Sequence, residues 1–96
     1  METHRHSKIA IIILVWNDYI NTKNTIDSVL KNKGCEIDVF VVDNASTDEC
    51  IDKIKNDYQN VSNIHYLMNS QNWGYAEGNN IAIRYCMDHG YDYFFI

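Results

Sequence analysis

Apolar residues fall in short continuous runs along the chain, and these runs predict the strands of a sheet. Residues 9–16 and 37–42 are rich in Ile, Val and aromatic side chains, as in strands that are covered on both faces. Two further runs, at residues 64–68 and 91–96, predict a third and a fourth strand. More polar segments separate the four runs.

Within these polar segments, apolar residues recur at helical spacing, which predicts three helices. The apolar stripes are Tyr19, Ile26, Val29 and Leu30; then Ile51, Ile54 and Tyr58; and then Ile81, Ala82, Tyr85, Cys86 and His89. Gly34 and Gly90 are expected to end the first and third helices. Ser46, followed three residues later by Glu49, fits a capping box that starts the second helix. Residues 69–80 are rich in Asn and Gly and are expected to form a loop.

Alternating strands and helices predict an α/β fold, a three-layer αβα domain whose sheet is mostly parallel and has about four strands. Residues 1–8 are expected to be a polar N-terminal tail, and residues 9–96 a single domain. In such sheets ligands bind outside the carboxyl ends of the strands. Three polar clusters are expected at that edge, at residues 17–18, 43–48 and 69–80.

Composition narrows the classes of partner. Eight basic and thirteen acidic residues among 96 give a formal net charge of −5. This argues against binding nucleic acid or an anionic membrane, because both need a basic surface. The three cysteines, Cys35, Cys50 and Cys86, are odd in number and form no C-x-x-C pair, so reduced cytoplasmic thiols are expected. The N-terminus lacks the apolar core of a signal peptide, and His4 and His6 are expected to belong to the polar tail rather than to a metal site.

The expected turn after the first strand, VWNDYINT, contains no glycine, which disfavours a dinucleotide fingerprint or a phosphate loop. Trp16 offers a flat ring and Asn17 an amide, which suit a nucleobase; a core residue and a helix cap are the alternative roles. Asp43 can accept hydrogen bonds from a base or a ribose, or serve only the turn. A receiver-like phosphorylation domain would need its acceptor Asp where this chain has Asn69.

Three segments carry a further signal: IIILVWN at residues 11–17, VVDNASTD at residues 41–48 and NWGYAEGNNIAI at residues 72–83. In this order they resemble the N-terminal part of family 2 glycosyltransferases, in the rhamnosyltransferase-like branch. Two positions differ from the family pattern: Glu77 stands where relatives often carry a small residue, and Ala82 stands where they often carry Gly. The resemblance runs from Lys8 onward and implies the Rossmann-like GT-A fold of nucleotide-diphospho-sugar transferases.

The resemblance also implies a set of nucleotide-binding positions. They are Val15, Trp16, Asn17, Asp43, Asn44, Asn72, Gly74, Asn79 and Asn80. Asp43 would hold the nucleoside, Trp16 and Asn17 would line the base pocket, and the 72–80 loop would lie over the nucleotide.

Several of these residues have structural alternatives. Asn44, Ser46 and Asp48 can serve the turn and cap the next helix, and Gly74 and Gly78 can be conformational. Arg84 is expected to be solvated or paired with a carboxylate rather than to bind a phosphate.

The resemblance further implies an Asp-x-Asp motif beyond Ile96 that holds Mg²⁺ or Mn²⁺, and a general base in the following half. No residue of this chain is therefore expected to be catalytic or to bind metal. We expect the chain to be the donor-nucleotide part of a cytoplasmic enzyme of polysaccharide biosynthesis, peripheral at the inner face of the membrane when full-length. Self-association through the uncovered C-terminal strand or sheet face is also expected. The alternatives are a non-catalytic nucleotide-binding or interaction module and an α/β domain without a ligand.

Overall fold

The computed structural model describes residues 8–31 and 36–95. The elements in chain order are β1 (Ile9–Val15), α1 (Tyr19–Leu30), β2 (Ile37–Asp43), α2 (Cys50–Asp57), β3 (Ile64–Met68), α3 (Gly74–Asp88) and β4 (Tyr93–Phe95). The expectations for His4, His6, Gly34, Cys35 and Ile96 lie outside the described residues. No helix in the described ranges is long and apolar enough to cross a membrane.

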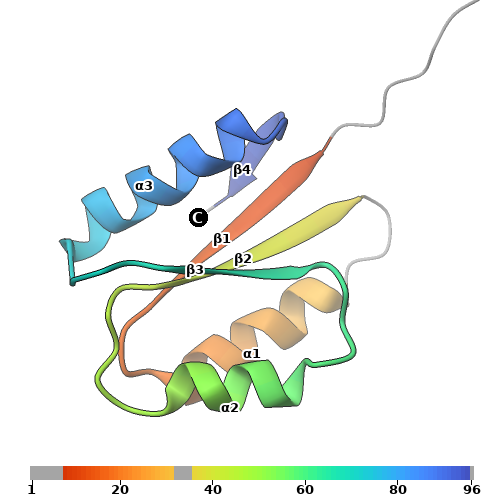
Figure 1. Ribbon diagram of the computed structural model, residues 1–96. Helices are drawn as coiled ribbons and strands as arrows, with labels where there is room; N and C mark the ends of the chain where they lie inside the picture. The colour runs from red at the N-terminus through yellow and green to blue at the C-terminus, as the bar shows by residue number, and fades with distance from the viewer. Residues whose placement is uncertain (1–7, 32–35, 96) are drawn as a thin grey trace, which may run out of the picture.

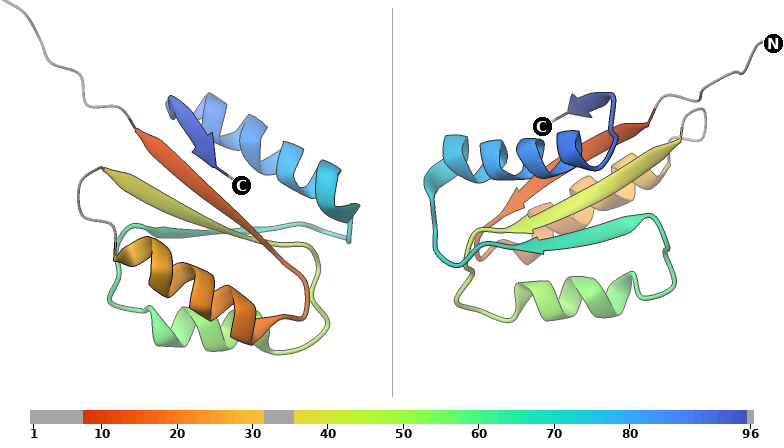
Figure 2. Two further views of the ribbon diagram at one scale, coloured as in Figure 1. Left: turned by 180° about the vertical axis from the view of Figure 1, so that it is seen from behind. Right: turned by 45° about the horizontal axis from the view of Figure 1, so that its top comes forward.

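The strands form one parallel sheet in the order β3-β2-β1-β4. Helices α1 and α2 cover one face of the sheet and α3 covers the other (Figure 1). Figure 2 shows the same arrangement from behind, with α1 and α2 side by side. The predicted α/β architecture of three layers around a parallel sheet is therefore confirmed.

The central strands are buried on both faces because their side chains alternate between two cores. Ile13 and Val41 pack with α1 and α2, around the fully buried Ile26 and Ile54. The intervening residues of the same strands pack with α3: Ala10, Ile12, Phe40 and Val42 join Ala82 and Cys86. The unbroken apolar runs of β1 and β2 follow from this double coverage.

Several predicted boundaries were wrong. The fourth strand, expected at residues 91–96, begins only at Tyr93. The expected 69–80 loop ends early, because α3 already begins at Gly74 and its first turns occupy the Asn- and Gly-rich segment. The capping box at Ser46 does not form: α2 begins at Cys50, and Glu49 at its N-cap makes no side-chain hydrogen bond there. The Asp48 carboxylate instead accepts the backbone N–H of Cys50 at 3.0 Å.

Gly78 lets α3 approach the sheet closely. It is one of the buried residues of α3, and a Cβ atom at this position would lie 2.9 Å from Cδ1 of Leu14 and 3.3 Å from Nδ2 of Asn44. Because glycine has only a hydrogen atom in place of a side chain, α3 can pack closely against the ends of β1 and β2. The role of Gly78 is therefore to allow close packing. Glycine is otherwise unfavourable in the interior of a helix.

We expect Gly78→Val to lower the free energy of unfolding by about 1–3 kcal/mol, because the added methyl groups overpack the contact with Leu14 and Asn44. Urea unfolding followed by circular dichroism measures the change. Asn80→Val is the matched control, because Asn80 is exposed on the same helix and Asn and Val have similar helix propensities. Equal effects of the two substitutions would contradict the packing argument.

Candidate functional site

The carboxyl ends of three strands meet at one edge of the sheet. Val15 of β1 is in register with Asp43 of β2, which is in register with Met68 of β3. The polar clusters that follow these strands are joined by hydrogen bonds between residues about 30 positions apart in the chain. The predicted convergence of the three clusters is therefore confirmed.

Asp43 lies at the centre of this edge and is only 5% exposed. Its Oδ1 accepts the backbone N–H of Ser46 at 2.9 Å, which closes the turn after β2. Among the described residues nothing donates a hydrogen bond to Oδ2, and this oxygen is not fully buried. Asp43 thus serves the turn with one oxygen and keeps the other available.

Ala45, within the same turn, has a φ of 64°, which is a sparsely populated value for a residue other than glycine. The turn holds it there from both sides: the N–H of Asn44 donates to the carbonyl of Val15 at 2.8 Å, and Ser46 is bonded to Asp43. Strain of this kind is found where surrounding bonds over-determine the backbone, and ligand sites are common among such places.

Asn17 ties the turn after β1 to the turn after β2. It has a φ of 50°, and its Oδ1 accepts the backbone N–H groups of Thr47 at 2.8 Å and Asp48 at 3.2 Å. Its own N–H donates to Oγ of Ser46, and its Nδ2 donates to Oγ1 of Thr47, both at 3.0 Å. The alternative role of Asn17 as a helix cap is wrong, because Asp18 caps α1.

Asn44 is buried, 2% exposed, and both ends of its amide are bonded. Its Nδ2 donates to Oδ1 of Asn72 at 2.8 Å and to the carbonyl of Gly74 at 3.3 Å. Its Oδ1 accepts from Nδ2 of Asn69 at 3.2 Å and from the N–H of Trp73 at 3.1 Å. One side chain therefore fixes the segment that leads into α3.

Asn79 and Asn80, adjacent on α3, have opposite environments. Asn80 is exposed, whereas Asn79 is 2% exposed and both polar atoms of its amide are buried with no hydrogen-bond partner in the described part of the chain. An unpartnered buried amide costs about 1–3 kcal/mol, so its retention calls for an explanation. Gly74 starts the same helix with a φ of 82°, which agrees with the conformational role expected for it.

Three large aromatic rings near this edge are exposed. Trp16 at the end of β1 is 52% exposed, which contradicts a core role for it. Trp73 and Tyr75, at the start of α3, are 45% and 70% exposed. The sequence reasoning missed these last two as surface rings, although the run Asn-Trp-Gly-Tyr places two aromatic residues around a helix-starting glycine.

The charged groups of the edge are mainly acidic. The pKa of Asp48 is lowered, chiefly by hydrogen bonding from Cys50, while burial raises the pKa of the Cys50 thiol. Arg84 lies 3.5 Å from the carboxylate of Glu77, so the expected carboxylate pairing is confirmed. In the described part of the chain, no three His, Cys, Asp or Glu side chains are placed to hold a metal ion.

The model of the glycosyl transferase family 2 domain matches residues 10–95, nearly the whole chain. The chain belongs to glycosyl transferase family 2. The resemblance of its three motifs to this family is thereby confirmed.

Two similar proteins give the context. A dTDP-rhamnosyl transferase, RfbF of Shigella flexneri, is 29% identical over 85 residues, which are 88% of this chain and 27% of that protein. The solved mannosyltransferase PcManGT of Pyrobaculum calidifontis, in complex with GDP-Man and Mn²⁺, superposes with a TM-score of 0.72 at 21% identity. That match covers 86% of this chain and 25% of the other, and it shows the shared GT-A fold. The chain thus spans about a quarter of the length of both relatives.

We expect Asn44→Ala to lower the free energy of unfolding by about 2–4 kcal/mol, because four hydrogen bonds made by a buried side chain are lost. Hydrogen exchange should accelerate most at the amide of Trp73, which donates to Asn44. Asn24→Ala, at an exposed position of α1, is the control and should change the stability by less than about 0.5 kcal/mol. An unchanged exchange rate at Trp73 would show that Asn44 does not hold this segment.

Proposed function

We propose that this chain is the nucleotide-sugar-binding part of a glycosyltransferase that transfers a sugar from a UDP- or dTDP-linked donor to a glycan or other acceptor. Membership of family 2 supports the reaction class. The observation that carries the binding role is Asp43, a nearly buried carboxylate at the carboxyl end of β2 whose Oδ2 accepts no hydrogen bond from the described residues. Such an oxygen can accept from a base N–H or a ribose hydroxyl.

The exposed rings suit the base itself. A base stacked on an aromatic side chain gains about 1–3 kcal/mol, and Trp16, Trp73 and Tyr75 offer such faces around the same edge. In this proposal Val15 and Asn17 support the base pocket from behind, because their polar groups hold the two turns together.

The start of α3 would meet the ribose and diphosphate. Asn72 and Gly74 lie where the helix begins, and Asn80 is exposed on its second turn. Asn44 acts by holding these residues in place. Asn79 would contribute after a change in the packing of this turn, when a ligand could satisfy the amide atoms that lack a partner.

The metal is a separate matter. The mannosyltransferase was solved with Mn²⁺, and a divalent cation suits a diphosphate because it offsets the negative charge. The described residues do not fit such a centre, since they bring no three ligating side chains together. The Mg²⁺ or Mn²⁺ expected for the longer enzyme is therefore assigned no site on them.

Further parts of the proposal concern context. Relatives named for dTDP-rhamnose and GDP-mannose chemistry leave the sugar and the base to experiment. A glycan acceptor, a cytoplasmic location with peripheral membrane attachment, and self-association complete the proposal. The competing function is a nucleotide-binding or interaction module without chemistry.

We expect Asp43→Asn to weaken the binding of UDP and dTDP about tenfold or more, because a hydrogen bond to a charged acceptor becomes one to a neutral amide. Asparagine retains an oxygen for the N–H of Ser46, so the turn should persist. Nuclear magnetic resonance titration gives the dissociation constants. Asp52→Asn, at an exposed position on α2, is the control. A folded Asp43→Asn protein with unaltered affinity would contradict the proposed role of the Asp43 carboxylate in nucleotide binding.

We expect the purified 96-residue chain to bind nucleotide without transferring sugar, because its described residues form no metal centre. Incubation with UDP- and dTDP-sugars, Mn²⁺ and an oligosaccharide acceptor, followed by mass spectrometry, measures transfer. Metal-dependent product above a no-enzyme control would contradict this expectation. Failure to bind either nucleotide would favour an interaction module.

A further inference from the structure

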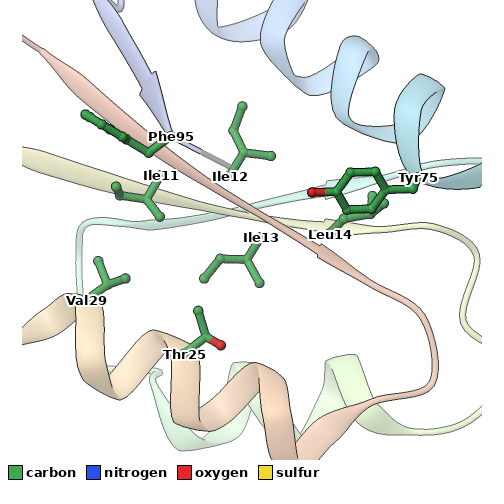
Figure 3. Close-up of a pocket in the computed structure, with 8 residues that line it drawn as sticks. All are labelled: Ile11, Ile12, Ile13, Leu14, Thr25, Val29, Tyr75 and Phe95. Atoms are coloured by element: carbon green, nitrogen blue, oxygen red, sulfur yellow. The ribbon is translucent and has the colours of Figure 1, made fainter.

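The first turn of α1 is held less firmly by apolar packing than the turns that follow it. In the later turns Ile26 is fully buried, and Val29 packs against the same core. Figure 3 shows Val29 opposite Ile11 and Ile13 of β1, in a close-up of a pocket between the two elements. In the first turn, by contrast, Ile20 is 64% exposed. The position of this turn therefore depends on other contacts.

Tyr19, the first residue of α1, connects this turn to α2. Its partly buried ring packs against the core between the sheet and these two helices. Its hydroxyl donates a hydrogen bond to Oδ2 of Asp57, the last residue of α2. The Nζ of Lys53, one turn earlier on α2, lies 5.7 Å from the centroid of the Tyr19 ring, within the range of a cation–π interaction. Two side chains of α2 therefore hold one side chain of α1.

A second group of the same kind contacts later turns of α1. The hydroxyl of Tyr58, which follows α2, lies 2.5 Å from Oδ1 of Asp27 and 3.2 Å from the carbonyl oxygen of Lys23. The Nζ of Lys23 lies 5.3 Å from the centroid of the Tyr58 ring and 3.3 Å from Oδ2 of Asp27. In both groups a tyrosine meets a lysine and an aspartate that are four positions apart on the other helix. We call them the Tyr19 clasp (Tyr19, Lys53 and Asp57) and the Tyr58 clasp (Tyr58, Lys23 and Asp27).

The electrostatics of both clasps agree with these contacts. The pKa of Tyr19 is raised, chiefly by its hydrogen bond to Asp57. Burial, followed by hydrogen bonding to Asp27, raises the pKa of Tyr58, and the same hydrogen bond is the main cause that lowers the pKa of Asp27. Both phenols therefore stay protonated at neutral pH and can donate to their carboxylates.

Tyr19 follows directly after the turn that contributes to the candidate site. Its neighbour Asp18 caps α1 by accepting the N–H of Asn21 at 3.2 Å. One residue earlier, Asn17 is bonded to the turn after β2, and Trp16 before it carries an exposed ring. Because these residues are consecutive in the chain, a displacement of Tyr19 would move the helix cap and the turn with it.

We propose that Tyr19 is a positioning residue for the nucleotide-binding edge. The Tyr19 clasp fixes the first turn of α1 and, through it, Trp16 and Asn17. The Tyr58 clasp is attached to turns that apolar packing already holds, so it stabilises the fold without this effect. This role rests on the proposed function, because the property that Tyr19 adjusts is the affinity of the edge for nucleotide. Tyr19 acts through its neighbours and does not touch the ligand.

The physical reason is the conformational entropy of the turn. A binding surface that is fixed in advance loses less entropy when a ligand binds than one that moves. Without the Tyr19 clasp, the first turn of α1 would keep its Asp18 cap but lose its link to α2. Segments with few buried apolar contacts open most readily. Opening at this end of α1 would allow Trp16 a wider range of positions and so weaken its stacking on a base.

The test compares Tyr19→Phe with Tyr58→Phe in the 96-residue chain, since each removes one hydroxyl and keeps the ring. Both should lower the midpoint of urea unfolding. Only Tyr19→Phe should weaken UDP and dTDP, by about threefold or more in nuclear magnetic resonance titrations. Only Tyr19→Phe should also speed hydrogen exchange, by about fivefold or more, at the amide of Thr22, which donates to the carbonyl of Asp18. Equal losses of affinity in the two variants would overturn the proposal.

Variants of Asp57 test the contact from the side of α2. Asp57→Ala removes the acceptor without altering α1, so it should reproduce the effects of Tyr19→Phe. The double variant should be no weaker in binding than either single variant, because both remove the same hydrogen bond. Asp57→Asn keeps an oxygen for the hydroxyl and should restore most of the affinity. Asn56→Ala, at the exposed neighbouring position, is the control and should change neither affinity nor exchange. Additive losses in the double variant would contradict the Tyr19 clasp.

Hydrogen exchange separates this role from the proposed function. If the unaltered chain binds neither nucleotide, the proposed function fails; exchange at Thr22 then still decides whether Tyr19 fixes the turn, and an unchanged rate in Tyr19→Phe overturns that role. If the chain binds nucleotide and Tyr19→Phe speeds the exchange without changing the affinity, the proposed function stands and the positioning role is wrong. Faster exchange together with weaker binding, in Tyr19→Phe but not in Tyr58→Phe, supports both.

Discussion

The arrangement of the candidate site depends on one buried amide, that of Asn44. A side-chain amide enclosed at the end of a strand is destabilising unless its donors and its acceptor are all used. Here they are used on residues 69–74, which lie after a different strand. These hydrogen bonds fix the start of α3 relative to the end of β2. They thereby also fix the positions of Trp73 and Tyr75. Aspartate, leucine or serine at position 44 would each lack part of this bonding set.

Most polar groups at this edge form hydrogen bonds within the protein, so few of them are available to a ligand. Asn17 uses its amide oxygen on Thr47 and Asp48, and Ser46 bonds to both adjoining turns. A surface held in this way loses little conformational entropy when it binds, so a few free groups can suffice. The free oxygen of Asp43 and the exposed rings are such groups. The strained φ of Ala45 is consistent with a turn fixed in advance.

The strands could be predicted because burial on both faces imposes unbroken apolar runs, and β3 was predicted to the residue. The first turns of α3 could not, since Gly74, Gly78 and the asparagines favour a loop locally. Packing against Leu14 and Asn44 overrides that preference, and it becomes visible only when the sheet is assembled. The capping box failed for a related reason: Ser46 is engaged by Asn17, a partner 29 positions away in the chain.

The sequence predicted which residues of the site come together but not how their bonds are divided. Asn17, Asp43 and Asn44 all lie at the sheet edge, yet of the three only Asp43 has a side-chain oxygen that accepts no hydrogen bond from the described residues. That division depends on contacts between segments about 30 residues apart, for which local pattern carries no signal.

Charge sets the final constraint on this site. A nucleotide diphosphate would meet Asp43 and Asp48 at the edge, and the nearby cation Arg84 is paired with Glu77. Like charges a few ångströms apart repel unless a cation lies between them. On the proposed function, this chain therefore recognises the nucleoside through rings and a single carboxylate, and the diphosphate is neutralised by groups brought to the edge from outside the described residues.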